Sequence, residues 1–328
     1  QSGEDEEVMV SITDNQLDIY KESVNYLTGY KYLCNEQLAS KLIGLLAYQQ
    51  YMQSKGEKVK VDKAIRPIIH RLTNHQNKRQ LWSWWGNSEN TSFWMSAHIL
   101  RALKMAQDAG YPVELNLNGL KVEYAHTRPY RGMKLEDIEI LHALHEWKVE
   151  ADYSSAVRLL EPFVRQLEQK EDSLANRNKY YRPLSYLKEK LLLWEIKQQV
   201  DSVNVGDSVR PYLKKDMLEG VYCDDGRRTY YWEGNQMINT LIAYRIIKND
   251  PSLCKLKENM QLYILRTKER GWNTYQASSA VATVLTDLLA GSGGMSGTSV
   301  SVSGKDHQRI TEFPYHARLT AGDSLLIS

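Results

Sequence analysis

Cys34 and Gln37 place a thiol and a side-chain carboxamide three residues apart, at the start of a segment with helical periodicity. On the first turn of a helix this spacing brings both side chains to one face. If the sulfur attacks the carboxamide and ammonia leaves, the product is an internal thioester with its acyl group on Gln37 and Cys34 as the leaving group. A helix N-terminus and exclusion of water both tune how easily a thiolate leaves. The alternative is an ordinary buried cysteine.

The two residues between them suit the first turn of the same helix. Glu36 carries a negative charge that favours the positive end of the helix dipole. Asn35 is of a residue type that caps helices. We therefore expect Cys34, Glu36 and Gln37 to form the site, with Asn35 as the cap.

Three stretches of the chain resemble the thioester domain of the alpha-2-macroglobulin family, particularly its bacterial members. They are residues 30–40 (YKYLCNEQLAS), with an aromatic lead-in before Cys-x-Glu-Gln, residues 84–97, with Trp-Trp-Gly and then TSFWMSA, and residues 271–277 (GWNTYQA). The resemblance extends over about residues 20–290. Lys31 and Leu33 depart from the family pattern, which usually has a proline and a glycine there.

The resemblance implies a protease inhibitor that acts once, rather than an enzyme with turnover. In the family, a protease cleaves a bait segment elsewhere in the full protein, and the rearrangement uncovers the thioester. A lysine of the protease then attacks the Gln37 carbonyl, and Cys34 leaves as thiolate. The implied partners are target proteases and the remaining domains of the full-length protein. The implied setting is periplasmic or cell-surface, with a role in bacterial defence, and no cofactor or metal is expected.

Two further residues receive roles from the resemblance. Tyr32 matches an aromatic that bacterial relatives place beside the thioester, where it is proposed to shield the bond from water. The alternative is ordinary packing at the helix entry. His126 lies in about the region from which a histidine of complement relatives directs the acyl group towards hydroxyls. The alternative is an ordinary loop histidine.

Composition argues against several classes of partner. The chain has 328 residues and a formal net charge of +2, which gives no reason to expect nucleic acid or an anionic membrane as a partner. Its longest apolar runs, such as residues 42–47 and 191–194, are far too short to span a bilayer. The first residues lack the pattern of a signal peptide, and we expect a mature or excised segment.

The remaining cysteines indicate neither a disulfide framework nor a convincing metal site. Cys223 and Cys254 are far apart in sequence, and neither has a second cysteine at metal-ligand spacing. Cys223 precedes Asp224 and Asp225, which is compatible with a zinc site. The Asp-Asp-Gly sequence is more typical of a turn, which is the preferred interpretation.

Apolar periodicity predicts a mainly α fold. Helices are expected over residues 38–52, 94–109, 135–147, 155–167, 184–196, 236–247, 256–265 and 276–290. Similar lead-in loops recur at a spacing of roughly 40 to 50 residues, which is a helix-pair period compatible with an open solenoid or a closed ring. The family resemblance implies the closed ring, an α/α toroid of paired helices.

Strand-like alternation is confined to the ends of the chain, at residues 8–13 and 298–303, with a further short apolar run at 317–328. We therefore expect a toroidal thioester domain over residues 14–290. Residues 1–13 and 291–328 are expected to be flanking β segments of an adjoining domain. As a short β remnant of that domain, the two ends should pair with each other.

Two other functions are compatible with the residues. A toroidal carbohydrate- or isoprenoid-processing enzyme would use paired carboxylates, for which Asp224, Asp225 and Glu233 are candidates beside several aromatic residues. The other is an inert helical scaffold in which Cys34 does no chemistry.

Overall fold

The computed structural model describes residues 8–12, 16–31, 33–54, 56–229, 235–268, 271–287, 300–303, 307–310, 315–319 and 326–327. Contacts between residues divide the chain into two units. One is residues 23–284, and the other combines residues 1–22 with residues 285–328.

Helices dominate the first unit. Its α-helices are α1 (Gln16–Gly29, which begins in the other unit), α2 (Asn35–Ser54), α3 (Asp62–Asn74), α4 (Phe93–Asp108), α5 (Asn118–Leu120), α6 (Arg128–Arg131), α7 (Asp137–Glu146), α8 (Tyr153–Arg177), α9 (Leu187–Val200), α10 (Gly206–Val209), α11 (Gln236–Ile247), α12 (Cys254–Thr267) and α13 (Thr274–Ala280). Shorter turns of other helix types are η1 (Lys121–Thr127), η2 (Arg210–Tyr212), η4 (Pro251–Leu253) and η6 (Val281–Leu285).

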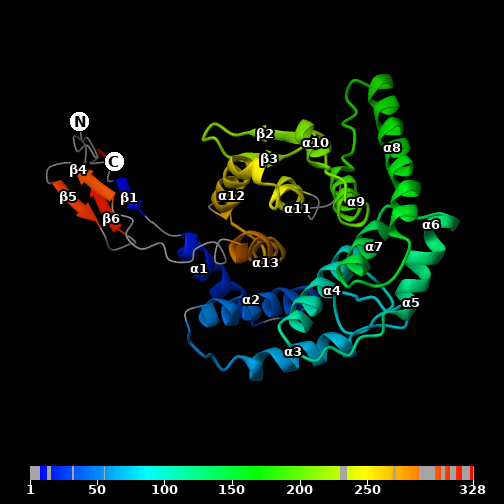
Figure 1. Cartoon of the computed structure of the whole chain (residues 1–328), viewed down its shortest axis with the longest axis horizontal. Coiled ribbons are helices and arrows are strands. Elements are labelled where there is room, and N and C mark those ends of the chain that lie inside the picture. The colour runs from blue at the N-terminus through cyan, green and yellow to red at the C-terminus, as the bar shows by residue number, and fades with distance from the viewer. Residues whose placement is uncertain are drawn as a thin grey trace. The chain divides into compact units, whose positions relative to one another are not determined.

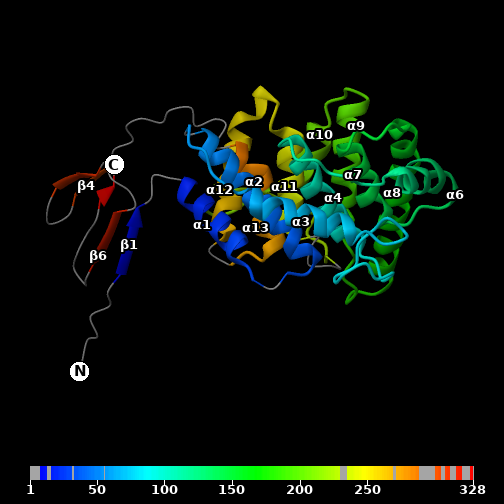
Figure 2. The same cartoon turned by 90° about the horizontal axis from the view of Figure 1, so that it is seen from below.

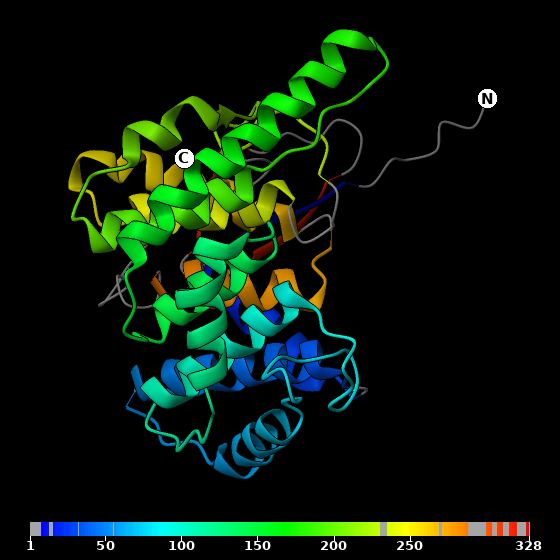
Figure 3. The ribbon, with the colours of Figure 1, turned by 90° about the vertical axis from the view of Figure 1, so that its right-hand side faces the viewer.

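The helices of this unit form a closed ring of pairs. Around the inside, α2, α4, α7, α9, α11 and α13 each contact the next, and α13 contacts α2 again (Figure 1). Outside them, α3 packs against α2, as Figure 2 shows from below, and α12 packs against α11. The long helix α8 covers α9 (Figure 3). The fold is therefore mainly α, and the predicted ring of paired helices is confirmed.

Inner and outer helices differ in their side chains. The inner helix α2 is buried around most of its circumference, for example at Leu38, Leu42, Ile43 and Leu45. An outer helix such as α3 has its apolar residues on one stripe, Ile65, Ile68, Ile69 and Leu72, and exposes the rest. An inner helix has neighbours on all sides, so its sequence must be apolar around almost its whole circumference. This distinguishes the inner from the outer helices in the sequence.

The starts of the inner helices α4, α7 and α9 lie together at one end of the ring. A cavity of about 430 Å³ is lined there by the starts of α4, α7 and α9, including Trp94, Glu139 and Lys188. The Trp94 ring also contacts the rings of Trp84 and Tyr275, at centroid distances of 5.8 and 5.1 Å. Aromatic side chains at or before the starts of several inner helices therefore meet at this end of the ring.

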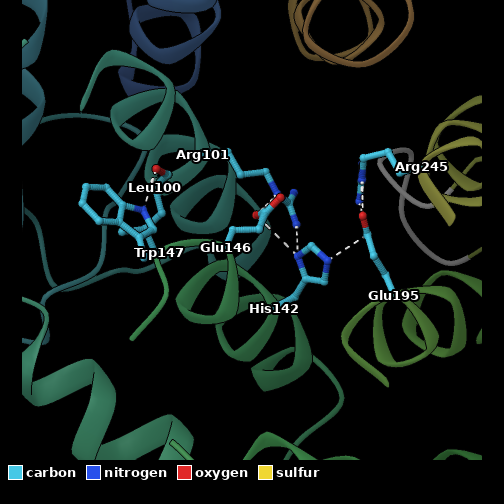
Figure 4. A network of polar contacts seen from close by, with 7 residues as sticks. All are labelled: Leu100, Arg101, His142, Glu146, Trp147, Glu195 and Arg245. Carbon is cyan, nitrogen blue, oxygen red and sulfur yellow. Dashed lines mark hydrogen bonds and ion pairs between the residues drawn. The ribbon is translucent and has the colours of Figure 1, made fainter. Parts of the chain in front are cut away.

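A chain of buried charges ties four inner helices together (Figure 4). Arg101 of α4 donates to Glu146 of α7 over 2.7 Å, and His142 of α7 lies 2.8 Å from Glu195 of α9. Arg245 of α11 donates to both carboxylate oxygens of Glu195, at 2.7 and 2.6 Å. Each glutamate is thus paired with an arginine, and His142 lies between the two pairs; pairing of this kind is the condition under which buried charge is tolerated.

The prediction that strands are confined to the chain ends is wrong. Strands β2 (Leu213–Lys215) and β3 (Val221–Cys223) form an antiparallel hairpin inside the helical unit. Asp216 fixes its turn by accepting hydrogen bonds from the backbone N–H groups of Leu218 and Gly220. Strands of three residues are too short to display a two-residue alternation, so periodicity could not detect them.

The second unit holds the strands of both chain ends. Strand β1 (Val8–Ile12) pairs antiparallel with β6 (Tyr315–Leu319), with Val8 opposite Leu319. Strand β4 (Val300–Ser303) pairs with β5 (His307–Ile310) and with β7 (Leu326–Ile327). The predicted pairing of the N-terminal strand with the end of the chain is confirmed. No helix among the described residues is long and apolar enough to cross a membrane.

Candidate functional site

Cys34 is the residue that caps the N-terminus of α2. Its carbonyl oxygen accepts the hydrogen bond of Leu38 N–H, at 2.9 Å, which is the first bond of the helical ladder. Its own backbone N–H donates to Oε1 of Gln37, at 3.2 Å. A glutamine at the third helical position that reaches back to the capping residue is half of a capping box. The Gln37 carboxamide is thereby held at the residue that carries the thiol.

Asn35 is not the cap that the sequence analysis expects, because the helix begins one residue earlier than a cap at Asn35 would require. As the first residue inside α2, Asn35 instead binds a distant loop. Its backbone N–H donates to the Trp84 carbonyl at 3.0 Å. Its side-chain Nδ2 donates to the carbonyls of Ser83 and Gly86 at 2.8 and 2.9 Å, and its Oδ1 lies 2.6 Å from Nδ1 of His75. These bonds fix residues 83–86 beside the first turn.

Cys34 is only 4% exposed. Burial raises the pKa of the Cys34 thiol, while the backbone N–H groups of Gln37 and Glu36 lower it. The net direction is upward. A thiol with a raised pKa forms thiolate less readily and is a poorer leaving group.

An open hollow of about 630 Å³ lies in front of the cysteine and the glutamine. It is lined by Gly29, Tyr30, Lys31, Cys34, Gln37, Trp84 and Trp85. Trp84 is 43% exposed and Trp85 is 64% exposed, so both indoles face solvent around the hollow. A small nucleophile could therefore approach Gln37 past an aromatic wall.

Glu36 faces the interior of the ring instead of the hollow. It accepts hydrogen bonds from Ser40 of α2, at 2.7 Å, and from Thr274 of α13, at 2.8 Å. Burial raises the pKa of Glu36, and the two hydroxyl donors lower it, with a net upward direction. Glu36 thus ties the first turn of α2 to α13, a role beyond the dipole partner that the sequence predicts.

Ser40 extends this tie to α4. Its Oγ lies 3.0 Å from Nε2 of His98 and 3.0 Å from Oγ of Ser278. Burial and Arg101 lower the pKa of His98 to about 3, so its ring is neutral. Because the Ser40 hydroxyl donates to Glu36, Nε2 of His98 carries the hydrogen that Ser40 accepts. The sequence did not lead us to predict that Ser40, His98 and Ser278 belong to this network. Ser40 could have indicated it, because it is a polar residue four positions after Glu36 in an apolar helix.

The family resemblance also gives roles to Tyr32 and His126. Tyr32 lies outside the described residues. His126 is exposed on the π-helix η1. It is not among the residues that line the hollow.

Two of the three candidate carboxylates of the alternative enzyme, Asp224 and Asp225, accept hydrogen bonds from other side chains. Asp224 accepts from Lys214 at 2.8 Å, and Asp225 accepts from Ser185 at 2.8 Å. Glu233 lies outside the described residues. Cys223 is buried, and burial followed by the charges of Asp224 and Asp225 raises the pKa of its thiol to about 12. Within the described part of the chain, no group of three or more His, Cys, Asp and Glu residues could hold a metal ion.

Asn35→Ala should destabilise the helical unit by about 1–3 kcal/mol, because the carbonyls of Ser83 and Gly86 would lose their side-chain donor. The measurement is urea unfolding followed by circular dichroism. Asn90→Ala, at an exposed position of the same loop, is the matched control and should change the free energy of unfolding by less than about 0.5 kcal/mol. Equal stability of both variants would show that the Asn35 bonds contribute little.

The ring of helix pairs, with a cysteine capping an inner helix, defines the class of this domain as an α/α toroid. No protein-family profile matches the sequence, and no curated protein matches it. Solved structures do match the fold. Alpha-2-macroglobulin from Escherichia coli, solved from its domain MG7 to its C-terminus, has a TM-score of 0.56 and 14% identity over 96% of this chain.

Two other solved chains match to a similar degree. Salmonella alpha-2-macroglobulin reacted with methylamine has a TM-score of 0.53 and 14% identity, over 97% of this chain. Trypsin-activated alpha-2-macroglobulin from Escherichia coli has a TM-score of 0.54 and 14% identity, over 95% of this chain. The present chain spans about half of the first of these three solved chains (48%) and about a fifth of the other two (22% and 21%).

Proposed function

We propose that this chain is the thioester domain of a bacterial alpha-2-macroglobulin-like protease inhibitor, and that it traps attacking proteases by acyl transfer from Gln37 with Cys34 as leaving group. The observation that carries the proposal is the 3.2 Å hydrogen bond between Cys34 N–H and Gln37 Oε1, at a helix N-terminus beside an open hollow. The likeness in fold to bacterial alpha-2-macroglobulins supports it.

Formation of the bond follows from this arrangement. The Cys34 sulfur attacks Cδ of Gln37, the C–N bond breaks, and the amide nitrogen takes the proton given up by the thiol and leaves as ammonia. Negative charge develops on Oε1 during the attack. The Cys34 N–H that already donates to Oε1 would stabilise that charge, as a donor in an oxyanion hole does.

Capture uses the same groups in a second acyl transfer. An unprotonated amine of the target attacks Cδ, the C–S bond breaks, and the sulfur leaves as thiolate and takes a proton. The amide that forms tethers the target, so the trap acts once. Because burial raises the pKa of the Cys34 thiol, the sulfur is a poor leaving group while it is enclosed. Exposure would lower that pKa and increase reactivity.

The proposal extends to the setting of the domain. Residues 14–290 would be the toroidal thioester domain, and residues 1–13 and 291–328 would belong to an adjoining domain of a longer protein. Tyr32 would shield the bond from water, and His126 would influence transfer to hydroxyls. The partners would be target proteases and the remaining domains, in the periplasm or at the cell surface.

Intact mass tests the proposal directly. We expect the protein to be lighter than its sequence by one ammonia, with the Cys34 thiol blocked. Methylamine should then add once, and one new thiol should appear. A mass equal to the sequence mass, with a free Cys34 thiol and no methylamine adduct in freshly prepared protein, would contradict a thioester.

A further inference from the structure

We propose that Lys31 is an internal competitor for the acyl group, and that it closes a Lys31–Gln37 isopeptide bond when no target arrives. This inference rests on the proposed function, because it requires the thioester. It starts from a side chain that the trap itself does not use. Lys31 lines the same hollow as Cys34 and Gln37.

The lead-in chain is held over the helix face that carries Gln37. Lys41 lies four residues after Gln37 in α2, so the two side chains share one face. The Lys41 ammonium donates to the Tyr30 carbonyl at 3.1 Å, which places the backbone next to Lys31 above that face. On the other side, Arg71 donates to the Leu33 carbonyl at 3.5 Å. The backbone is thus anchored on both sides of Lys31.

The Lys31 side chain is available for reaction. It is exposed, and within the part of the chain that the structure describes it makes no hydrogen bond or ion pair. A lysine amine sits at the end of a flexible four-carbon stem, which lets it sample the hollow. Neighbouring Tyr30, Trp84 and Trp85 form the walls of that hollow.

The reaction balances without a further reagent. Unprotonated Nζ of Lys31 attacks Cδ of Gln37, a C–N bond forms, and the C–S bond breaks. The Cys34 sulfur leaves as thiolate, and the proton lost from Nζ neutralises it. The product has the same mass as the thioester, but it has a free thiol and no activated acyl group.

The effective concentration of each amine determines which one reacts with the thioester. A nucleophile tethered by a short segment has an effective concentration of about millimolar, above that expected for a free protease. An external target must therefore be delivered quickly, while Lys31 sets the lifetime of an unused trap. Hydrolysis, the other route of loss, differs because it adds one water to the mass.

The test compares Lys31→Arg with wild type after incubation at mildly alkaline pH, where more amine is unprotonated. Arginine keeps the charge but is not a nucleophile under these conditions. Lys63→Arg, at an exposed position of α3, is the matched control. Methylamine reactivity should decay roughly tenfold more slowly in Lys31→Arg than in the other two proteins. Wild type should yield a cross-linked peptide containing Lys31 and Gln37, with unchanged intact mass and a free thiol.

Two results would overturn the inference, and they separate it from the proposed function. If Lys31→Arg takes up methylamine but loses reactivity as fast as wild type, and no cross-linked peptide forms, the thioester stands and Lys31 is not a competitor. If Lys31→Arg shows neither the ammonia loss nor a methylamine adduct, the thioester itself fails, and the isopeptide fails with it.

Discussion

Cys34→Ala should abolish covalent capture of amines and leave the folded domain almost unchanged. Alanine offers no sulfur to form the thioester and no leaving group for its opening, so methylamine uptake should fall to background. The substitution removes one small buried side chain at a helix start, for which a loss of stability of about 1 kcal/mol is expected. Mass spectrometry after methylamine treatment measures the first effect, and urea unfolding measures the second.

Cys254→Ala is the matched control, because Cys254 is exposed and lies on the outer helix α12. It should take up methylamine like wild type. Gln37→Glu is a second test variant. Glutamate has the shape of glutamine but no amide nitrogen that could leave as ammonia, so this variant should form no thioester. Undiminished methylamine labelling of Cys34→Ala would exclude Cys34 as the leaving group.

The closeness of Gln37 to Cys34 could be predicted because it is local, although the observed bond comes from the Cys34 backbone N–H and not from its thiol. A spacing of three residues at a helix start fixes which face both side chains occupy, whatever the rest of the fold does. The bonds from Asn35 to residues 83–86 and from Glu36 to Thr274 could not be predicted in this way. Glu36 and Thr274 are 238 residues apart, and only the closed ring brings α13 beside α2.

The helices show the same contrast between what local sequence predicts and what depends on long-range contacts. The apolar inner helices were predicted because each buries residues on most of its surface. Helix α3 was not predicted, although Ile65, Ile68, Ile69 and Leu72 follow a helical stripe, because these four residues stand among mostly polar, exposed neighbours. Helix α8 runs ten residues beyond its predicted end at residue 167, over a polar stretch that has no apolar repeat. Closure of the ring depends on contacts between its first and last helices, which no local pattern encodes.

Glu195→Ala should strongly destabilise the helical unit. Glu195 accepts two bonds from Arg245 and one from His142, so its removal leaves the Arg245 charge without its partner. Removing one member of a buried ion pair costs about 3–5 kcal/mol. We expect a loss of stability near the lower end of this range because the Arg245 side chain is 21% exposed. Glu161→Ala, which breaks a more exposed pair with Lys197, should cost less than about 1 kcal/mol.

The same network of charged residues should make the domain less stable in acid. Burial alone would raise the pKa of Glu146, but Arg101 and His142 lower it to about 2. A carboxyl group whose pKa is lower in the folded than in the unfolded protein stabilises the fold at pH values above its unfolded pKa, which is about 4.3. This stabilisation is lost as the pH falls towards 2. The free energy of unfolding of wild type should therefore decrease between about pH 5 and pH 2. Because Arg245 and His142 also lower the pKa of Glu195, Glu195→Ala should show a shallower decrease. Parallel pH curves for the two proteins would mean that Glu195 carries no net stabilising charge interaction.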